Sequence, residues 1–169
     1  MPAGGDVELD RLRFKGDPKH GGAHSELGEL ADEAARGFAR LGEIFRERGR
    51  MAAARTEYEK AIARVGSGNA ALTAKYAVAA IATGKDQDAE RALGAAAKDH
   101  PHYAALHVNL GRIYVKRKDW TRARAALLLA NRTDPFDPEI HAGLALACEG
   151  LGDAAGAARE KRFTALLSH

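Results

Sequence analysis

The sequence has few of the residues that form disulfides or favour β-sheets. Cys148 is the only cysteine among the 169 residues, so the chain can form no internal disulfide. Valine and isoleucine together number 10, whereas alanine numbers 37, a composition that favours helices over strands. Proline occurs only five times and is absent from 19–100, so no helix in that range is broken by it. For Cys148 we expect a buried, unreactive thiol.

Long apolar runs are also missing, and the charge is nearly balanced. No stretch approaches the ~20 apolar residues that a membrane helix needs, so we expect no membrane partner. The opening residues, MPAGGDVELD, have neither the basic start nor the apolar stretch of a signal peptide. With no targeting segment visible, a cytoplasmic location is the default expectation. The formal net charge of +3 does not by itself imply a nucleic-acid partner.

The chain divides into two parts by composition. Residues 1–24 hold five glycines and two prolines, which predicts a flexible arm or linker, with a short strand compatible with DVELDRLRF before Lys15. Residues 25–169 consist of alanine-rich amphipathic segments of about 12–16 residues separated by short breaks, which is typical of helices. The stretch SELGELADE is compatible with a backward extension of the first helix from Ala35, with Ser25 as a candidate N-cap.

The segments recur with a fixed period. An alanine returns at steps of 35, 34 and 34 residues, at Ala54, Ala89, Ala123 and Ala157. A larger apolar or aromatic residue returns at the same steps, at Leu41, Tyr76, Leu110 and Leu144. Three of the four breaks inside the units carry a glycine, at Gly49, Gly84 and Gly152, and Lys118 takes the remaining place. The spacing therefore predicts four similar units of two helices each.

The unit 104–137 shows the pattern most completely, with Leu110-Gly111, Tyr114, Ala123, Leu127, Ala130 and Pro135. This pattern resembles the tetratricopeptide repeat, and the resemblance covers about 135 of the 169 residues. It implies an all-α fold, a right-handed α-α superhelix of four helix-turn-helix repeats with eight helices. The units would span about 35–69, 70–103, 104–137 and 138–169, with the last helix as a cap.

A glycine inside a helix costs ~1 kcal/mol relative to alanine, so Gly111 needs a reason. We expect Gly111 and Ala123 to lie where the two helices of their unit cross, because both remove side-chain bulk there. Leu110, Tyr114 and Leu127 would fill the space on either side. Asp119 and Asp153 are placed to cap the second helices of the last two units.

The resemblance implies that the first helix of each unit lines a concave groove. By register, the groove residues are Lys75, Val78 and Ile81 from the second unit and Val108, Asn109, Arg112, Val115 and Lys116 from the third. The fourth unit adds Glu139, Leu146 and Glu149. These residues predict an apolar floor with a basic rim. Asn109 either bonds the backbone of a bound peptide or merely lies exposed on its helix.

The function that follows is a non-catalytic scaffold for protein–protein interaction, monomeric, that binds a peptide or helix with apolar anchors and acidic residues. No catalytic, cofactor or metal residues are predicted. The GSGNAA stretch at 66–71 fits a loose dinucleotide pattern but follows a helical segment, which indicates a turn. His107 and His141 stand where the family places bulky packing residues. His20 and His24 have the i, i+4 spacing of metal ligands, but the glycines between them argue against a helix that would align them.

Two other interpretations stay open. The chain could be the adaptor tail of a larger multidomain bacterial enzyme, for example a peptidase, in which case these residues would still not be the catalyst. The basic stretch at 112–124 could bind nucleic acid or another polyanion, helped by Tyr114 and Trp120. Both aromatic residues fall at packing positions of the repeat, however, so we do not expect nucleic acid to be the partner.

Overall fold

A computed structural model of the chain describes residues 21–66 and 68–168. In these ranges it has eight helices and no strand, which confirms the predicted all-α architecture. The helices are α1 (Gly21–Glu47), α2 (Met51–Val65), α3 (Ala70–Ala82), α4 (Asp86–Asp99), α5 (Ala104–Lys116), α6 (Trp120–Asn131), α7 (Pro138–Gly150) and α8 (Ala154–Leu167).

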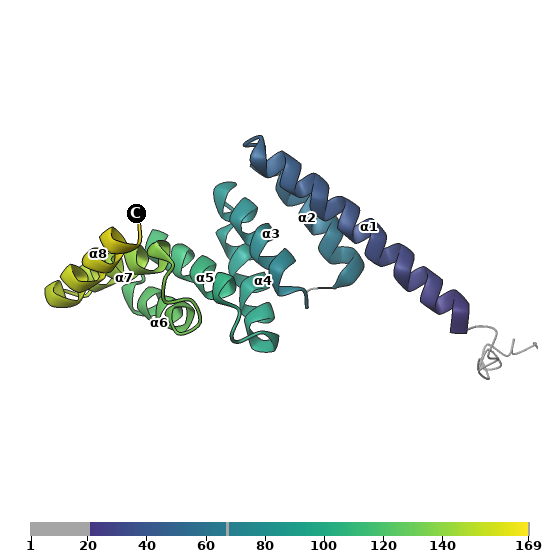
Figure 1. Cartoon of the computed structure of the whole chain (residues 1–169). Helices are drawn as coiled ribbons and strands as arrows, with labels where there is room; N and C mark the ends of the chain where they lie inside the picture. Colours follow the sequence, from purple (N-terminus) through teal and green to yellow (C-terminus); the bar gives the residue numbers. More distant parts are fainter. Residues whose placement is uncertain (1–20, 67, 169) are drawn as a thin grey trace, which may run out of the picture.

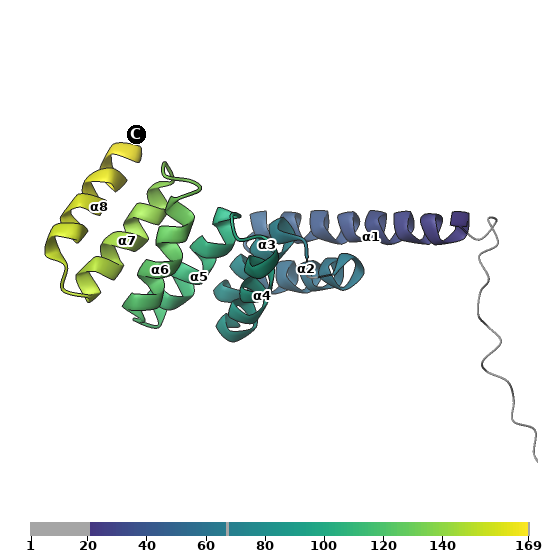
Figure 2. The same cartoon turned by 90° about the horizontal axis from the view of Figure 1, so that it is seen from below.

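The helices form four antiparallel pairs that stack side by side into a superhelix (Figures 1 and 2). Each helix contacts the next one along the chain, and the first helices of neighbouring units also meet, α3 with α5 and α5 with α7. Because α5 contacts both α3 and α7, these three helices form one layer of the array, and the second helices form the other layer. The predicted groove residues lie on α3, α5 and α7.

The first helix begins earlier than the predicted boundary of the arm. Helix α1 starts at Gly21, within 1–24, so Ser25 lies inside the helix instead of capping it. Extending an existing helix is easier than nucleating one, so the part of α1 that pairs with α2 can continue upstream. The expected strand before Lys15 and the rest of the arm lie outside the described residues.

Polar caps and left-handed turns set the limits of the helices within each unit. The carboxylates of Asp119 and Asp153 accept hydrogen bonds from the backbone N–H groups three residues ahead, at 3.1 and 2.8 Å, as predicted. The turns between paired helices need a positive φ, which Gly49, Gly84 and Gly152 adopt at 72°, 73° and 78°. Lys118 adopts the same conformation at φ 58° in the third unit.

The recurring small residues are the core of the array. Ala54, Ala89 and Ala123 have no exposed surface, and Ala157 is 4% exposed, so the period seen in the sequence is a burial pattern. At Gly111 the close neighbour is Leu127, since a Cβ built on this glycine would lie 2.6 Å from Cγ and Cδ2 of that leucine. Gly111 therefore lies at a close approach of α5 and α6, as predicted. Leu127 occupies the space directly over the glycine instead of flanking it, and the nearest atoms belong to this leucine and not to Ala123.

Candidate functional site

A mostly apolar pocket of about 190 Å³ opens between α5 and α7. Helix α5 contributes Val108, Gly111, Arg112 and Val115, helix α7 contributes Glu139, Ala142, Gly143 and Leu146, and Leu127 of α6 forms the floor. Each of the two first helices supplies residues at positions i, i+3, i+4 and i+7, which share one face of a helix. We call this site, defined by these nine residues, the α5–α7 pocket.

The pocket exists because two glycines face one leucine. A Cβ on Gly111 would lie 2.6 Å from Leu127, and a Cβ on Gly143 would lie 2.8 Å from Cδ1 of the same leucine. The side chain of Leu127 is thus wedged between two backbones, and it is 2% exposed. Leu146 stands at the edge of the pocket and is 48% exposed, so it offers apolar surface to a ligand.

One ion pair spans the pocket. The guanidinium of Arg112 donates from Nε to a carboxylate oxygen of Glu139, which joins α5 to α7. The same guanidinium donates from a terminal nitrogen to Oδ1 of Asn109, at 3.1 Å. Both charges remain partly exposed, so water screens this pair.

The side-chain amide of Asn109 is not exposed, although both predicted roles, bonding a peptide backbone or lying on the helix surface, require exposure. The residue is 3% exposed, its Nδ2 donates to the carbonyl oxygen of Ala105 at 2.8 Å, and its Oδ1 accepts from Arg112. Donor and acceptor are therefore both engaged inside the protein, and Asn109 orients Arg112 instead of facing a ligand. A polar side chain inside a helix often bonds the carbonyl four residues back, which is the signal that could have shown this.

The structure brings together only part of the predicted groove. Val108, Arg112 and Val115 line the α5–α7 pocket, and Glu139 and Leu146 join them as expected. The second-unit residues lie outside this pocket, with Val78 and Ile81 half-buried and Ile81 packed against the main core. What the sequence did not reveal is Gly143, whose missing side chain helps to open the pocket.

The predicted basic rim is balanced by acids from neighbouring units. Each of its three cations has a carboxylate partner: Lys75 with Glu43, Arg112 with Glu139 and Lys116 with Asp86. The first and third of these pairs have nitrogen–oxygen distances of 2.8 Å. Each pair joins two different units, so these cations stabilise the stacking and contribute little free positive charge to the groove.

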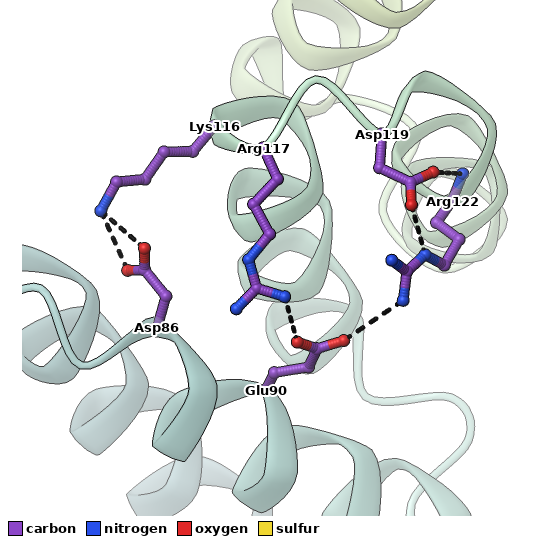
Figure 3. A network of polar contacts seen from close by, with 6 residues as sticks. All are labelled: Asp86, Glu90, Lys116, Arg117, Asp119 and Arg122. Atoms are coloured by element: carbon purple, nitrogen blue, oxygen red, sulfur yellow. Dashed lines mark hydrogen bonds and ion pairs between the residues drawn. The ribbon is translucent and has the colours of Figure 1, made fainter.

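Basic residues of the stretch 112–124 are also paired with acidic side chains. Figure 3 shows that Lys116 and Arg117 reach Asp86 and Glu90 of α4, and that Arg122 lies between Glu90 and Asp119. The hydrogen bond from the backbone N–H of Arg122, together with its guanidinium, holds the pKa of the Asp119 carboxyl below its usual value. The positive charge that suggested a polyanion partner is thus largely neutralised by this network, whose α4 acids lie outside the stretch.

The aromatic residues of this stretch are packing residues, as predicted. The guanidinium carbon of Arg122 lies 4.6 Å from the ring centroid of Tyr114. The ring of Trp120 lies so close to Gly150 that a side chain there would overlap it. Neither ring is free to stack on a nucleic-acid base as it stands.

His107 and His141 pack between helices, as their position in the repeat predicted. They are 5% and 4% exposed, and Nε2 of each donates to a proline carbonyl, of Pro101 at 2.8 Å and of Pro135 at 2.9 Å. Within the described ranges, no group of three or more histidine, cysteine or acidic side chains could hold a metal ion. None of the helices described here is long and apolar enough to cross a membrane. Cys148 is buried, and this burial raises the pKa of its thiol.

Comparisons with known proteins agree with this architecture. Residues 87–147 match the family model of the tetratricopeptide repeat. A comparison with curated proteins found no match. Among solved structures, MamA is 20% identical, covering 79% of this chain and 72% of that one, with a TM-score of 0.69. TTC0263, a thermophilic TPR protein of Thermus thermophilus, is 21% identical, covering 79% of this chain and 74% of that one, with a TM-score of 0.71. YrrB is 13% identical, covering 86% of this chain and 80% of that one, with a TM-score of 0.66. At these identities the similarity shows the fold.

Proposed function

Because this chain is built from tetratricopeptide repeats, we propose that it is a non-catalytic scaffold that binds a peptide or helix of another protein in its concave groove. The observation that carries the proposal is the α5–α7 pocket, an apolar opening formed by the first helices of two adjacent units. Repeats of this kind generally serve as protein-interaction scaffolds, and the similar structure YrrB has an unusual peptide-binding site. A groove along stacked first helices suits an extended or helical segment.

The pocket favours one apolar anchor. Its volume of about 190 Å³ leaves room for one apolar side chain, and its floor and walls are aliphatic apart from the Arg112–Glu139 pair. Anchors that fill a desolvated pocket carry most of the affinity at protein interfaces. We therefore infer that most of the affinity comes from one apolar residue of the ligand, which would contact Leu127 and Leu146.

Acidic residues in the ligand would add less than the sequence predicted. A carboxylate that binds Lys75, Arg112 or Lys116 must compete with the internal partner of that cation. Exchanging one exposed ion pair for another gives little net free energy. Charge would therefore mainly orient the ligand and affect its association rate, while the apolar anchor would control dissociation.

The test uses two exposed leucines that differ in location. Peptides selected from a random phage-displayed library with the whole chain as bait are labelled and titrated against wild type, Leu146→Asp and Leu129→Asp. The two leucines are 48% and 43% exposed, but only Leu146 lines the pocket. We expect Leu146→Asp to weaken binding roughly tenfold or more, because it places a charge where the apolar anchor contacts the pocket, and Leu129→Asp to leave it unchanged.

Two results would contradict the proposal. One is a peptide whose affinity is insensitive to Leu146→Asp but falls with Leu129→Asp, which would move the site to the outer helices. The other is a library from which no peptide is enriched over the uncoated surface. Circular dichroism of both variants checks that the helices are intact.

A further inference from the structure

Helix α1 exposes an apolar stripe along its length. Leu30, Leu41 and Ile44 are 61%, 44% and 41% exposed, and Ala34 and Gly37 lie between them in the helix. The spacing alternates between four and three residues, which places all five on one side of the helix. In the sequence, Leu27 continues the same spacing upstream.

The later units bury the equivalent of this stripe. The residues that correspond to Leu41 are at most 8% exposed, and those that correspond to Ile44 have no exposed surface. The first set is Tyr76, Leu110 and Leu144, and the second is Ala79, Ile113 and Ala147. In those units the second helix of the preceding unit packs against the first helix, as α2 does against α3. No described helix precedes α1, so within the part of the chain that the structure describes its stripe is a packing face without a partner.

The length of α1 adds a second reason for a partner. It has 27 residues, whereas α2 has 15, and Figure 2 shows its N-terminal part running past the end of α2. Isolated helices shorter than about 12–15 residues are only marginally stable in water, and the part of α1 beyond α2 is a short helix of this kind unless another helix packs against it.

Gly37 has no close neighbour that would exclude a side chain, unlike the glycines where helices cross. A Cβ on Gly42 would lie 2.6 Å from the ring of Tyr58, whereas a Cβ on Gly37 would meet nothing within 4 Å. Glycine disfavours a helix interior, and no contact among residues 21–66 and 68–168 requires it at Gly37. A glycine and an alanine at the centre of the stripe would allow another helix to approach closely.

We propose that α1 pairs with α1 of a second copy in an antiparallel dimer that crosses at Ala34 and Gly37. The stripe is symmetric about a centre between Ala35 and Arg36, because Leu30 mirrors Leu41 and Ala34 mirrors Gly37. A two-fold axis at that centre would place each residue against its mirror residue in the other copy, which is what a symmetric dimer interface requires. Sequence alone led us to expect a monomer, since it does not show that this face is uncovered.

The charges beside the stripe fit the same arrangement. Glu33 and Arg40 are exposed, lie on the side of the stripe away from α2, and form no ion pair with another described residue. In an antiparallel pair, Glu33 of each copy would face Arg40 of the other, which gives two equivalent ion pairs. A parallel pair would not bring these two residues together, because they would then lie on opposite sides of the interface.

The other end of the array offers the competing arrangement. Phe163 and Leu166 of α8 are 44% and 73% exposed, so α1 of one copy could stack on α8 of the next. Such a head-to-tail contact is not closed and would continue into longer oligomers. The mirror symmetry of the stripe and of its charges favours the closed dimer.

Sedimentation equilibrium of the full chain over a range of concentrations tests the proposal. We expect a monomer–dimer equilibrium with no larger species, a monomer for Ile44→Glu, and an unchanged dimer for Leu166→Glu. Both residues are exposed in the single chain, so circular dichroism should show intact helices in both variants. A monomeric wild type, a ladder of larger oligomers, or loss of the dimer only in Leu166→Glu would overturn it.

A charge exchange then distinguishes the antiparallel pair from other dimers. Glu33→Arg and Arg40→Glu should each weaken the dimer roughly tenfold, because each creates two like-charge contacts. The double variant Glu33→Arg/Arg40→Glu restores two opposite-charge contacts and should return the dissociation constant to near that of wild type. A double variant as weak as the single ones would exclude this geometry.

Discussion

Single residues in this array are constrained by whatever lies opposite them, and its glycines show this clearly. Gly111 faces Leu127, whereas a Cβ on Gly94, inside α4, would meet nothing within 4 Å. The second unit has Ala77 in place of Gly111, and this alanine is fully buried, so a methyl fits there when the facing side chain allows it. Leu127 cannot yield in the same way, because Gly143 bounds it on its other side.

The substitution of these two glycines by alanine should therefore have opposite effects. Gly111→Ala forces the buried Leu127 to move, and we expect a net loss of about 1–2 kcal/mol after the gain in helix propensity is counted. Gly94→Ala gains that propensity without a clash and should stabilise the protein by roughly 0.5–1 kcal/mol. Urea denaturation of both variants measures the difference. Equal midpoints would mean that Leu127 readily repacks.

Lys118 is the residue that departs from the turn pattern. Its φ of 58° is the conformation that glycine adopts in the other three units, and side chains with a Cβ disfavour it. We expect Lys118→Gly to raise the free energy of unfolding by up to about 1 kcal/mol, because relief of strain outweighs the greater freedom of the unfolded chain. Lys118→Ala is the control, since it removes the charge but keeps the strain. A gain in both variants would indicate an electrostatic cause.

At the scale of elements, Glu43 connects the first three helices. Its Oε2 accepts hydrogen bonds from Nε of Arg46 at 2.8 Å and from the hydroxyl of Tyr58 at 2.7 Å, and its Oε1 lies 2.8 Å from Nζ of Lys75. The hydrogen bond from Arg46 is the largest cause that lowers the pKa of Glu43 to about 2, with Lys75 and Tyr58 assisting and burial opposing. This carboxylate therefore couples α1 to α2 and to the next unit.

The lowered pKa predicts a pH-dependent contribution to stability. An ionised carboxylate with a depressed folded-state pKa contributes fully above its ordinary value of 4.5, and the contribution is lost as the pH falls to about 2. Glu43→Gln should thus cost about 1–2 kcal/mol near neutral pH, discounted for partial exposure, and almost nothing at the acid end.

The measurement is urea unfolding of wild type and variant across that pH range. Asp88→Asn, which breaks an exposed pair with Arg91 inside α4, is the control and should have little effect at any pH. A difference between wild type and Glu43→Gln that does not change with pH would show that the carboxylate acts only through shape.

At the scale of the whole molecule, what the sequence reveals depends on how far apart the interacting residues are. The four units were predictable because burial admits only small residues at places such as Ala54 and Ala89, and these recur with the period. The pocket was only partly predictable. Arg112 and Glu139 are 27 residues apart, and Lys116 and Asp86 are 30 apart, in different units. Such pairs depend on how neighbouring units stack, which the pattern within one unit does not specify.

The contacts between units also decide how the molecule would respond to force. Because each unit touches only its neighbours, a pull on the two ends passes through every interface in series. Each interface then bears the same force, and the weakest one separates first. The α4–α5 and α6–α7 interfaces are supplemented by contacts of α3 with α5 and of α5 with α7. Among the described residues, α1 and α3 make no contact of comparable extent. Under force the interface between α2 and α3 should therefore separate first, and the α5–α7 pocket should keep its shape.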